Sequence, residues 1–181
     1  MIENNHPYFF RRLDRSDFDN LCIYLNRLSP ETRKRFGPHA FDKQSIIDFY
    51  SDEQHIQLGY IVLDLQTNQI LAYAIIKTGY LEHDRLRLES YGFELNADHD
   101  CTFAPSVADN LQGQGLGKGL FQFILADLKT RDMRRIILWG GVQANNERAI
   151  QYYLKNGFIR IGQFEHNGTH YDMVLTIPPE V

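Results

Sequence analysis

Cysteine and long apolar runs are scarce in this sequence. Cys22 and Cys101 are its two cysteines, too few for a disulfide framework or a zinc site. No run reaches the roughly 18 consecutive apolar residues of a membrane helix, and the first residues lack a basic segment followed by an apolar one. These absences predict a cytoplasmic protein with reduced cysteines, no membrane partner and no bound metal.

The sequence also lacks an excess of positive charge. Its net charge is −4, which argues against a nucleic-acid partner. The segment 118–160 is nevertheless basic, with eight Lys or Arg against three Asp or Glu, which leaves 11 basic and 20 acidic residues elsewhere. An anionic ligand near this segment explains the asymmetry, and charges scattered over solvated helix faces explain it equally well.

Nothing in the composition suggests disorder or more than one domain. The chain has 181 residues, of which 43% are hydrophobic and 23% charged, which is ordinary for a soluble globular protein. We therefore expect residues 1–181 to form a single domain with its own core.

The stretch 101–125 combines a strand, a run of glycines and a helix. Phe103–Val107 is short, apolar and followed by turn residues. Glycine then occupies every second position from 113 to 119, and apolar residues continue at helical spacing from Leu116. A helix that starts among glycines leaves backbone N–H groups unpaired at the positive end of its dipole. This arrangement predicts a site for a phosphate group.

Two common phosphate loops do not fit these glycines. The dinucleotide pattern G-x-G-x-x-G needs glycine at position 118 or 120, where Lys118 and Leu120 stand. The P-loop of nucleotide triphosphatases needs Ser or Thr after Gly-Lys, where Gly119 stands. Both classes are therefore excluded as interpretations of this loop.

Two motifs resemble those of the GCN5-related N-acetyltransferase (GNAT) family. Gln112–Gly117 resembles its Q/R-x-x-G-x-G/A pyrophosphate loop, and Asn146–Phe158 resembles its N-x-x-A-x-x-x-Y-x-x-x-G-F segment. A strand-like stretch separates them, as in the family. Leu28–Phe36 is similar to an early helical segment of many members, although this likeness carries less weight.

The resemblance implies an α/β fold with a mixed, mainly antiparallel sheet and helices on both faces. The local patterns predict where its elements lie. We expect Ser16 and Asp19 to form a capping box at the start of the first helix. Asp42 is expected to cap the second helix, and Asn145 or Asn146 the last one. Strands are expected at 8–13, 56–65, 70–77, 103–107, 135–139, 158–164 and 170–177, and helices at 16–28, 42–50, 116–128 and 146–155.

The stretch 78–100 predicts no clear element. Tyr80, Tyr91 and Phe93 could line an acceptor pocket, but a longer hairpin whose aromatic rings pack on the core is the favoured interpretation. His39, in a loop, is expected to be structural rather than catalytic.

The resemblance also implies roles for individual residues. The pantetheine arm of acetyl-CoA is expected to pair with the backbone around Val107, where Pro105 agrees with a broken ladder, or equally with a simple bulge. Tyr153 is expected to face the thioester sulfur. The cofactor's pyrophosphate is expected on the backbone of Gly113, Gln114, Gly115, Leu116, Gly117 and Lys118, with help from the side chains of Gln112 and Asn146.

The general base is where the sequence departs from the family. The glutamate that many members carry on the strand before the loop falls near Thr102, and no carboxylate stands there. Asp98, His99 and Asp100 lie just upstream, and Asp100 is the candidate base. Polar residues before a strand are also ordinary turn formers, so a structural role stays open.

These observations predict an N-acetyltransferase. Acetyl-CoA would be the co-substrate, and a primary amine of a small molecule or peptide would attack the thioester directly. A non-catalytic acyl-CoA binding or regulatory module is the alternative, because the usual glutamate is missing. The acceptor and the oligomeric state, a homodimer included, stay open.

Overall fold

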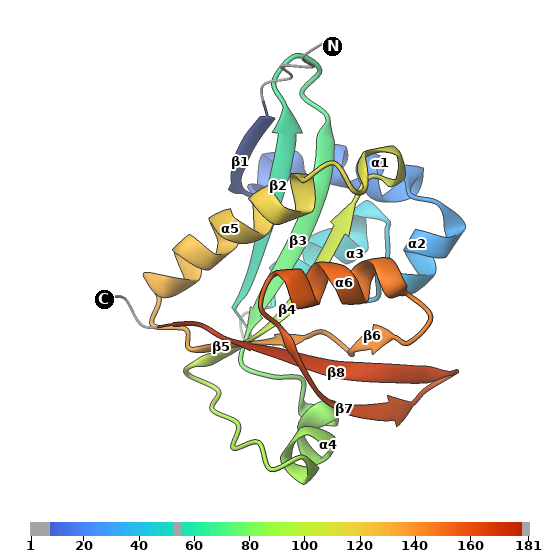
Figure 1. The fold of residues 1–181 in the computed structure, drawn as a ribbon. Helices are drawn as coiled ribbons and strands as arrows, with labels where there is room; N and C mark the ends of the chain where they lie inside the picture. Colours follow the sequence, from blue (N-terminus) through green and yellow to red (C-terminus); the bar gives the residue numbers. More distant parts are fainter. Residues whose placement is uncertain (1–7, 53–55, 179–181) are drawn as a thin grey trace. The chain divides into compact units, whose positions relative to one another are not determined.

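The computed structural model describes residues 8–52 and 56–178, which form a mixed α/β structure (Figure 1). Eight strands make one sheet in the order β1-β2-β3-β4-β5-β8-β6, with β7 beside β8. The pair β4–β5 is parallel, whereas β1–β2, β5–β8, β6–β8 and β7–β8 are antiparallel. The predicted fold class, a mainly antiparallel mixed sheet with helices, is confirmed.

Most elements lie where the sequence predicts them. The strands are β1 Tyr8–Arg12, β2 Gln57–Asp64, β3 Ile70–Thr78, β4 Asp100–Val107, β5 Arg135–Leu138, β6 Val142–Gln143, β7 Ile159–Glu165 and β8 Thr169–Thr176. The α-helices are α1 Phe18–Arg27, α2 Pro30–Arg35, α3 Lys43–Tyr50, α4 Arg85–Ser90, α5 Leu116–Lys129 and α6 Glu147–Lys155. Short 3₁₀ turns lie at Arg15–Asp17, Glu82–Asp84 and Asp109–Leu111.

The chain divides into two compact units, neither of which is continuous in sequence. The first comprises Met1–Ile75 and Pro105–Ile124, and the second comprises Ile76–Ala104 and Leu125–Val181. Strands β3 and β4 and helix α5 each pass from one unit into the other.

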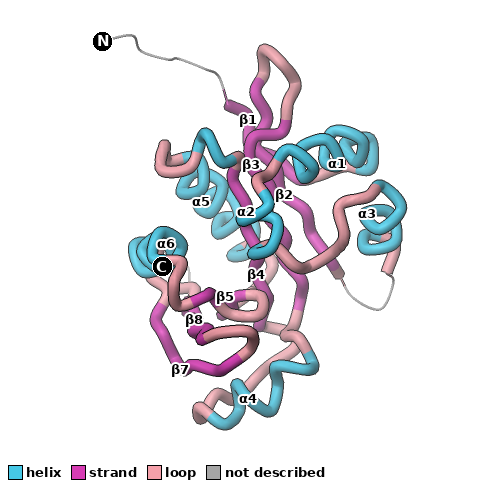
Figure 2. The backbone as a smooth tube through the Cα atoms, turned by 90° about the vertical axis from the view of Figure 1, so that its right-hand side faces the viewer, coloured by secondary structure: helices cyan, strands magenta, loops and turns pink. Residues whose placement is uncertain are grey.

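In the first unit, helices cover both faces of the strands. Figure 2 shows α1 and α3 on one side of β2 and β3, with the beginning of α5 on the other. Gly119 allows α5 to approach β1 closely, because a Cβ there would stand 2.8 Å from the ring of Phe10. The fully buried core residues include Leu21, Leu25, Ile46, Tyr60, Ile61 and Tyr73.

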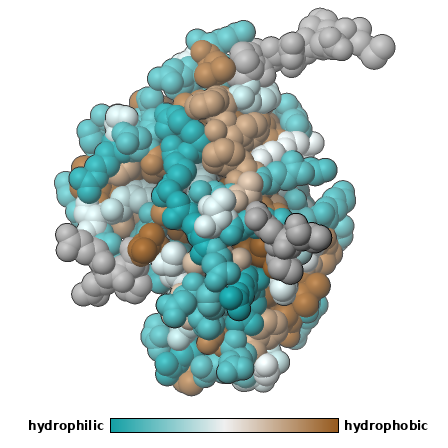
Figure 3. Space-filling view, turned by 90° about the vertical axis from the view of Figure 1, so that its left-hand side faces the viewer, coloured by the Kyte–Doolittle hydropathy of each residue, from teal (hydrophilic) through white to brown (hydrophobic). Residues whose placement is uncertain are grey.

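One surface of this unit carries exposed apolar side chains. Figure 3 views the molecule from the side of β1 and α5, and apolar side chains gather in a band in its upper half. Phe9 of β1 and Phe123 of α5 are among the exposed large apolar residues. Single apolar side chains on a surface are ordinary and need no partner.

Helix capping agrees with the prediction at α3 and α6 and differs from it at α1. Asp42 caps α3 by accepting from the Ser45 N–H, and Asn146 caps α6 by accepting from the Ala149 N–H. Ser29 caps α2, which has Pro30 in its first turn. The predicted capping box of Ser16 and Asp19 is wrong. Asp14 and Asp17 form the box instead, two residues earlier in the chain, because a 3₁₀ turn precedes α1.

The second unit contains elements that the sequence did not predict. The stretch 78–100 holds the 3₁₀ turn at 82–84 and α4, where a structureless or extended excursion was expected. Leu86 and Leu88 alternate with arginines in the sequence, which is the apolar spacing of a strand and does not indicate the short helix. In the helix Leu86 is exposed and Leu88 is buried. Tyr80, Tyr91 and Phe93 pack around the buried cluster of Leu88, Ile137 and Val174, as expected, but the longer hairpin that was expected to carry them is wrong.

A buried ion-pair network attaches α4 to β8. Arg87 bonds both carboxylate oxygens of Asp172 at 2.9 and 3.1 Å and pairs with Asp84 at 2.8 Å. The Tyr91 hydroxyl donates to Asp172 at 3.1 Å, and Asp172 is only 1% exposed. Charges buried this deeply need partners of this kind, so the network fixes α4 in one position on the sheet.

No helix in residues 8–52 and 56–178 has the length and apolar character that a membrane span requires.

Candidate active site

The ladder between β4 and β5 ends partway along β4. The pairing runs from Asp100 opposite Arg135 to Phe103 opposite Leu138, and the Trp139 N–H donates to the Phe103 carbonyl at 2.9 Å. Strand β4 nevertheless continues to Val107. Since Pro105 has no N–H to donate, its place after the last pair agrees with the predicted broken ladder. The backbone that leads to Val107 is therefore suited to pair with an extended ligand.

A hydrogen bond also joins Val107 to Gln112, the residue that precedes the glycine loop. Gln112 donates from its side-chain amide to the Val107 carbonyl at 3.2 Å. Gln114 turns back in the same way and donates to the Asn110 carbonyl at 2.9 Å. The side chains of both glutamines thus brace the loop on the strand that precedes it.

The glycine loop leaves its backbone open at the start of α5. Gly113 and Gly115 have φ angles of +82° and +90°, which other residues rarely adopt, and a Cβ at either position would meet nothing within 4 Å. The first bond of the helix runs from the Gly119 N–H to the Gly115 carbonyl at 3.0 Å. Within residues 8–52 and 56–178 the N–H groups of Gly115 and Leu116 have no acceptor. The loop thus offers an exposed cradle of donors at the positive end of a helix of 14 residues.

Asp109 ties helix α2 to the turn before this loop, a role that the sequence did not reveal. It accepts from the Ser29 N–H and hydroxyl, both at 2.8 Å, and from the Thr32 hydroxyl at 2.6 Å. Burial raises the pKa of Asp109, but these hydrogen bonds outweigh burial and hold the pKa below its usual value. The glycine loop is thereby attached to the helical segment 30–35 of the same unit.

Tyr153 lies in the second unit, on the buried face of α6. It is 9% exposed, and its ring packs edge-to-face on Phe158 and Tyr152 at 5.4 and 5.2 Å between centroids. Among the residues that the structure describes, its hydroxyl has no hydrogen-bond partner. Burial raises the pKa of this phenol, so the hydroxyl keeps its proton and is available as a donor.

The carboxylate of Asp100 forms hydrogen bonds within the fold, to Arg135 and to the backbone of Asn96. Its carboxylate is bonded by the Arg135 guanidinium at 2.9 and 2.7 Å and by the Asn96 N–H at 2.8 Å, and the residue is 2% exposed. Both oxygens are therefore occupied. Its assignment as the general base stays a prediction, which these contacts do not favour. Thr102, where the family glutamate falls, donates to the Gly79 carbonyl at 2.9 Å.

His39, expected to be structural, is held at both ring nitrogens. Nδ1 lies 2.7 Å from the Ala40 carbonyl and Nε2 lies 3.0 Å from the Tyr73 hydroxyl, which is 2.5 Å from the hydroxyl of Tyr50. Because a carbonyl can only accept, Nδ1 carries the proton and Nε2 accepts from Tyr73. Burial lowers the pKa of His39, which keeps this imidazole neutral.

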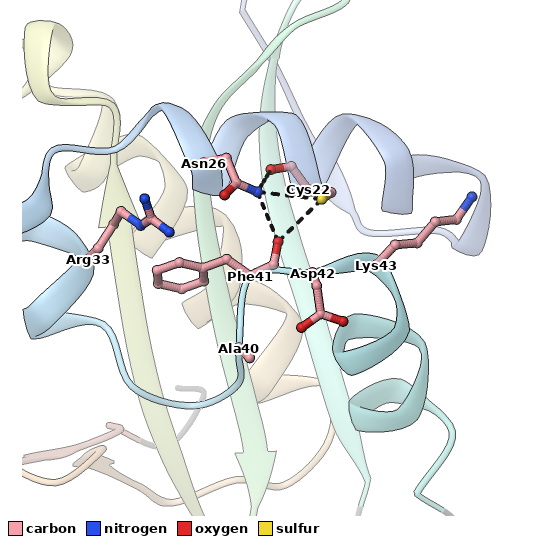
Figure 4. Close-up of a pocket in the computed structure, with 7 residues that line it drawn as sticks. All are labelled: Cys22, Asn26, Arg33, Ala40, Phe41, Asp42 and Lys43. Atoms are coloured by element: carbon pink, nitrogen blue, oxygen red, sulfur yellow. Dashed lines mark hydrogen bonds between the residues drawn. The ribbon is translucent and has the colours of Figure 1, made fainter.

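A surface pocket of the first unit lies between α1, α2 and the start of α3 (Figure 4). In it the Asn26 amide donates to the Phe41 carbonyl at 3.0 Å, and the Arg33 guanidinium lies 5.0 Å from the Phe41 ring centroid. Its volume is about 590 Å³, and its lining residues are Cys22, Asn26, Arg33, Ala40, Phe41, Asp42 and Lys43. None of these residues was predicted to act in the site.

The predicted site residues fall in both units. Val107, Gln112 and the loop 113–118 belong to the first, and Asp100, Asn146 and Tyr153 belong to the second. No group of three or more His, Cys, Asp or Glu that could hold a metal ion occurs in residues 8–52 and 56–178. A mixed sheet whose parallel pair stops early, followed by a glycine-lined helix start, places the chain in the class of acetyltransferase folds.

Comparisons with known proteins identify the family. Residues 23–158 match the model described as the acetyltransferase (GNAT) family, so the chain belongs to this family. Helices α1 to α3 and the loop and α6 motifs all lie in or overlap this match. None of the curated proteins matches the chain in sequence.

Several solved structures share the fold. A GNAT acetyltransferase from Streptococcus pneumoniae is 19% identical with a TM-score of 0.69, and the alignment covers 95% of this chain and 100% of that one. The yncA protein of Salmonella typhimurium, solved with its cofactor acetyl-CoA, is 14% identical with a TM-score of 0.70 and coverages of 97% and 96%. The ribosomal-protein-S18-alanine N-acetyltransferase from Escherichia coli is 18% identical, with a TM-score of 0.62 and coverages of 97% and 97%.

Proposed function

We propose that this protein transfers the acetyl group of acetyl-CoA to a primary amine of a small molecule or peptide. The observation that carries the proposal is the open backbone at Gly113 and Gly115, at the start of α5, in a chain of the GNAT family. A pyrophosphate fits these donors because the space that a Cβ would fill is empty. The yncA structure, solved with acetyl-CoA, supports acetyl-CoA as the co-substrate.

The chemistry assigned to the chain has three parts. When bound, acetyl-CoA supplies an activated acyl group with a thiolate leaving group. The backbone N–H groups of Gly115 and Leu116 bind the pyrophosphate, and the backbone near Val107 pairs with the pantetheine arm. The neutral amine forms the new N–C bond as the C–S bond breaks, and a base takes one amine proton. The hydroxyl of Tyr153 donates its proton to the sulfur that departs.

The acceptor is proposed as a class rather than as a compound. The E. coli neighbour is named for an alanine of ribosomal protein S18, but at 18% identity it gives the fold and not the acceptor of this chain. A cytoplasmic location fits the two free cysteines, of which Cys101 is buried. We propose no nucleic-acid partner, in keeping with the net charge of −4.

One assay distinguishes acetyl transfer from the alternative function, which is acyl-CoA binding without turnover. Purified protein is mixed with acetyl-CoA and a panel of amines, amino acids, aminosugars and peptides with free N-termini, and free thiol and acetylated product are measured. We expect at least one class of amine to raise thiol release at least about tenfold over the rate without amine. The thiol released should equal the acetylated amine formed.

Thiol release that no amine accelerates, from a protein that still binds acetyl-CoA, would support the binding module and contradict transfer.

A further inference from the structure

The hairpin of β7 and β8 holds a histidine, His170, that has no part in the proposed cofactor site. The His170 ring stacks on Phe164 with 5.3 Å between centroids and 23° between the ring planes. The edge of His166 lies against it, with 6.2 Å between centroids. His170 is half-buried. In the sequence His170 lies beside the turn residues Asn167 and Gly168 and belongs to no motif.

The hydrogen bonds of His170 settle its tautomer. Nδ1 lies 3.0 Å from the Gly168 carbonyl, and a carbonyl only accepts, so Nδ1 carries the hydrogen. In the neutral ring Nε2 then holds a bare lone pair. No residue in 8–52 or 56–178 forms a hydrogen bond with Nε2. One nitrogen is thus anchored while the other is open, which is the arrangement of a general base that awaits a proton.

A series of contacts fixes the plane of this ring. Phe164, on which His170 stacks, is covered by the Arg87 guanidinium, which lies 3.7 Å from its ring centroid. Arg87 is held in turn by Asp84 and Asp172. The imidazole therefore rests on a support that the buried ion-pair network makes rigid, whereas an ordinary loop histidine turns freely. Orientation of this kind lowers the cost of reaching a productive geometry.

The position of His170 in the sheet also suits the role. Strand β8 pairs with β5 up to Val174 opposite Ile137 and then continues to His170, which lies opposite Gln143 of β6. His170 is thus on the part of β8 beyond its pairing with β5, in the same direction as the end of the β4–β5 ladder. Alternate residues of a strand share a face, so His170 shares the face of Asp172 and Val174, on which α4 packs.

We propose that His170 is the general base that accepts a proton from the acceptor amine, a role that rests on the proposed acetyl transfer. The amine nitrogen forms its bond to the acyl carbon as the C–S bond breaks, and one amine proton passes to Nε2 of His170. The imidazolium then loses this proton to solvent. The thiolate takes its proton from Tyr153 or from water, and no other reactant is needed.

Other candidate bases are less suited by their contacts. Asp100 has both oxygens occupied, and His39 has both nitrogens occupied. His99 is bonded at Nδ1 to the Asp132 carbonyl, without a stacked ring to hold it. Of the titratable and charged groups around His170, His166 contacts its ring and Glu165 accepts from the hydroxyl of the neighbouring Thr169. Arg87 covers the supporting Phe164 and pairs with Asp84 and Asp172.

The test uses His170→Asn, which keeps an N–H donor near the Nδ1 position for the Gly168 carbonyl and removes the basic nitrogen. The acceptor is the amine of the panel with the highest turnover. We expect kcat to fall at least about tenfold with an unchanged melting temperature. The rise of kcat/KM with pH that an ionising base produces should be lost. The matched control, His166→Asn, should keep its rate within about twofold.

A second measurement keeps the proposal testable if the variant does not fold. Wild-type protein is treated with diethylpyrocarbonate, which acylates neutral imidazole, and the modified residues are read by mass spectrometry. We expect activity to fall in proportion to modification of His170 and to return with hydroxylamine. Full activity with His170 modified, or an unchanged rate and pH profile in folded His170→Asn, would overturn the proposal. An equal loss in His166→Asn would overturn it too.

These outcomes are distinct from failure of the proposed function, in which no amine would accelerate thiol release by the wild-type protein. A third variant, Asp100→Asn, tests the other candidate base. If Asp100 is structural, its variant should lower the melting temperature and leave the shape of the pH profile intact. Loss of the pH-dependent limb in Asp100→Asn at an unchanged melting temperature would assign the base to Asp100 and overturn the role of His170.

Discussion

Replacing Gly115 by valine is expected to weaken acetyl-CoA binding at least about 100-fold, or about 2.7 kcal/mol. The side chain would occupy the open space beside the backbone, where the pyrophosphate has to approach the N–H donors at the start of α5. The φ angle of +90° adds backbone strain to any residue with a Cβ. Isothermal titration of both proteins with acetyl-CoA measures the change.

Gly92→Val is the matched control for the strain. Gly92 has a φ of +81° and, like Gly115, open space where its Cβ would stand, but it lies at the end of α4. We expect both variants to lose similar stability, about 1–2 kcal/mol for the left-handed conformation, while only Gly115→Val loses affinity. Normal acetyl-CoA binding by folded Gly115→Val would leave this glycine with a structural role alone.

Removing the hydroxyl of Tyr153 is expected to lower kcat by at least about tenfold, since acid–base catalysis typically contributes roughly 10²–10⁴-fold to a rate. Tyr153→Phe keeps the ring that packs on Phe158 and deletes only the oxygen. Because the described residues offer this hydroxyl no partner, its loss breaks no hydrogen bond of the fold. The melting temperature and acetyl-CoA affinity should therefore barely change, and steady-state kinetics with the best acceptor gives kcat.

Tyr152→Phe is the internal control, since Tyr152 is the neighbouring phenol on α6 and burial raises its pKa as well. Its kcat should remain close to that of the wild type. If Tyr153→Phe turns over at the wild-type rate, Tyr153 serves as packing, and proton delivery to the thiolate passes to water.

The elements that could be predicted are those in which the turn residues, glycines and apolar spacing of one stretch all indicate the same structure. The helix start at Leu116 follows from glycines and helical spacing, and the end of α6 follows from Asn156 and Gly157, whose φ is +91°. The strand that ends at Val107 follows from the turn residues after it. In each case the backbone conformation is decided by residues within one or two turns of the chain.

The parts that could not be predicted depend on partners distant in sequence. Helix α4 is held by Arg87 on Asp172, 85 residues later, so its own apolar spacing does not identify it. Asp109 has the sequence signal of a turn former, and its bond to the Ser29 N–H, 80 residues earlier, has no local signal. Strand β6 has two residues and exists through its pairing with β8. His170 is distinguished from the other histidines of the chain by the stacked Phe164 and the anchored Nδ1, which only the folded structure shows.

Binding of acetyl-CoA by the glycine loop can be measured by thermal melting with candidate cofactors. Binding to the native state adds RT ln(1 + [L]/Kd) to stability, about 2.7 kcal/mol at a ligand concentration of 100 Kd. Acetyl-CoA should therefore raise the melting temperature clearly, and NAD and ATP at the same concentration should raise it much less. An equal shift with NAD, or no shift with acetyl-CoA, would contradict the assignment of this loop to acetyl-CoA.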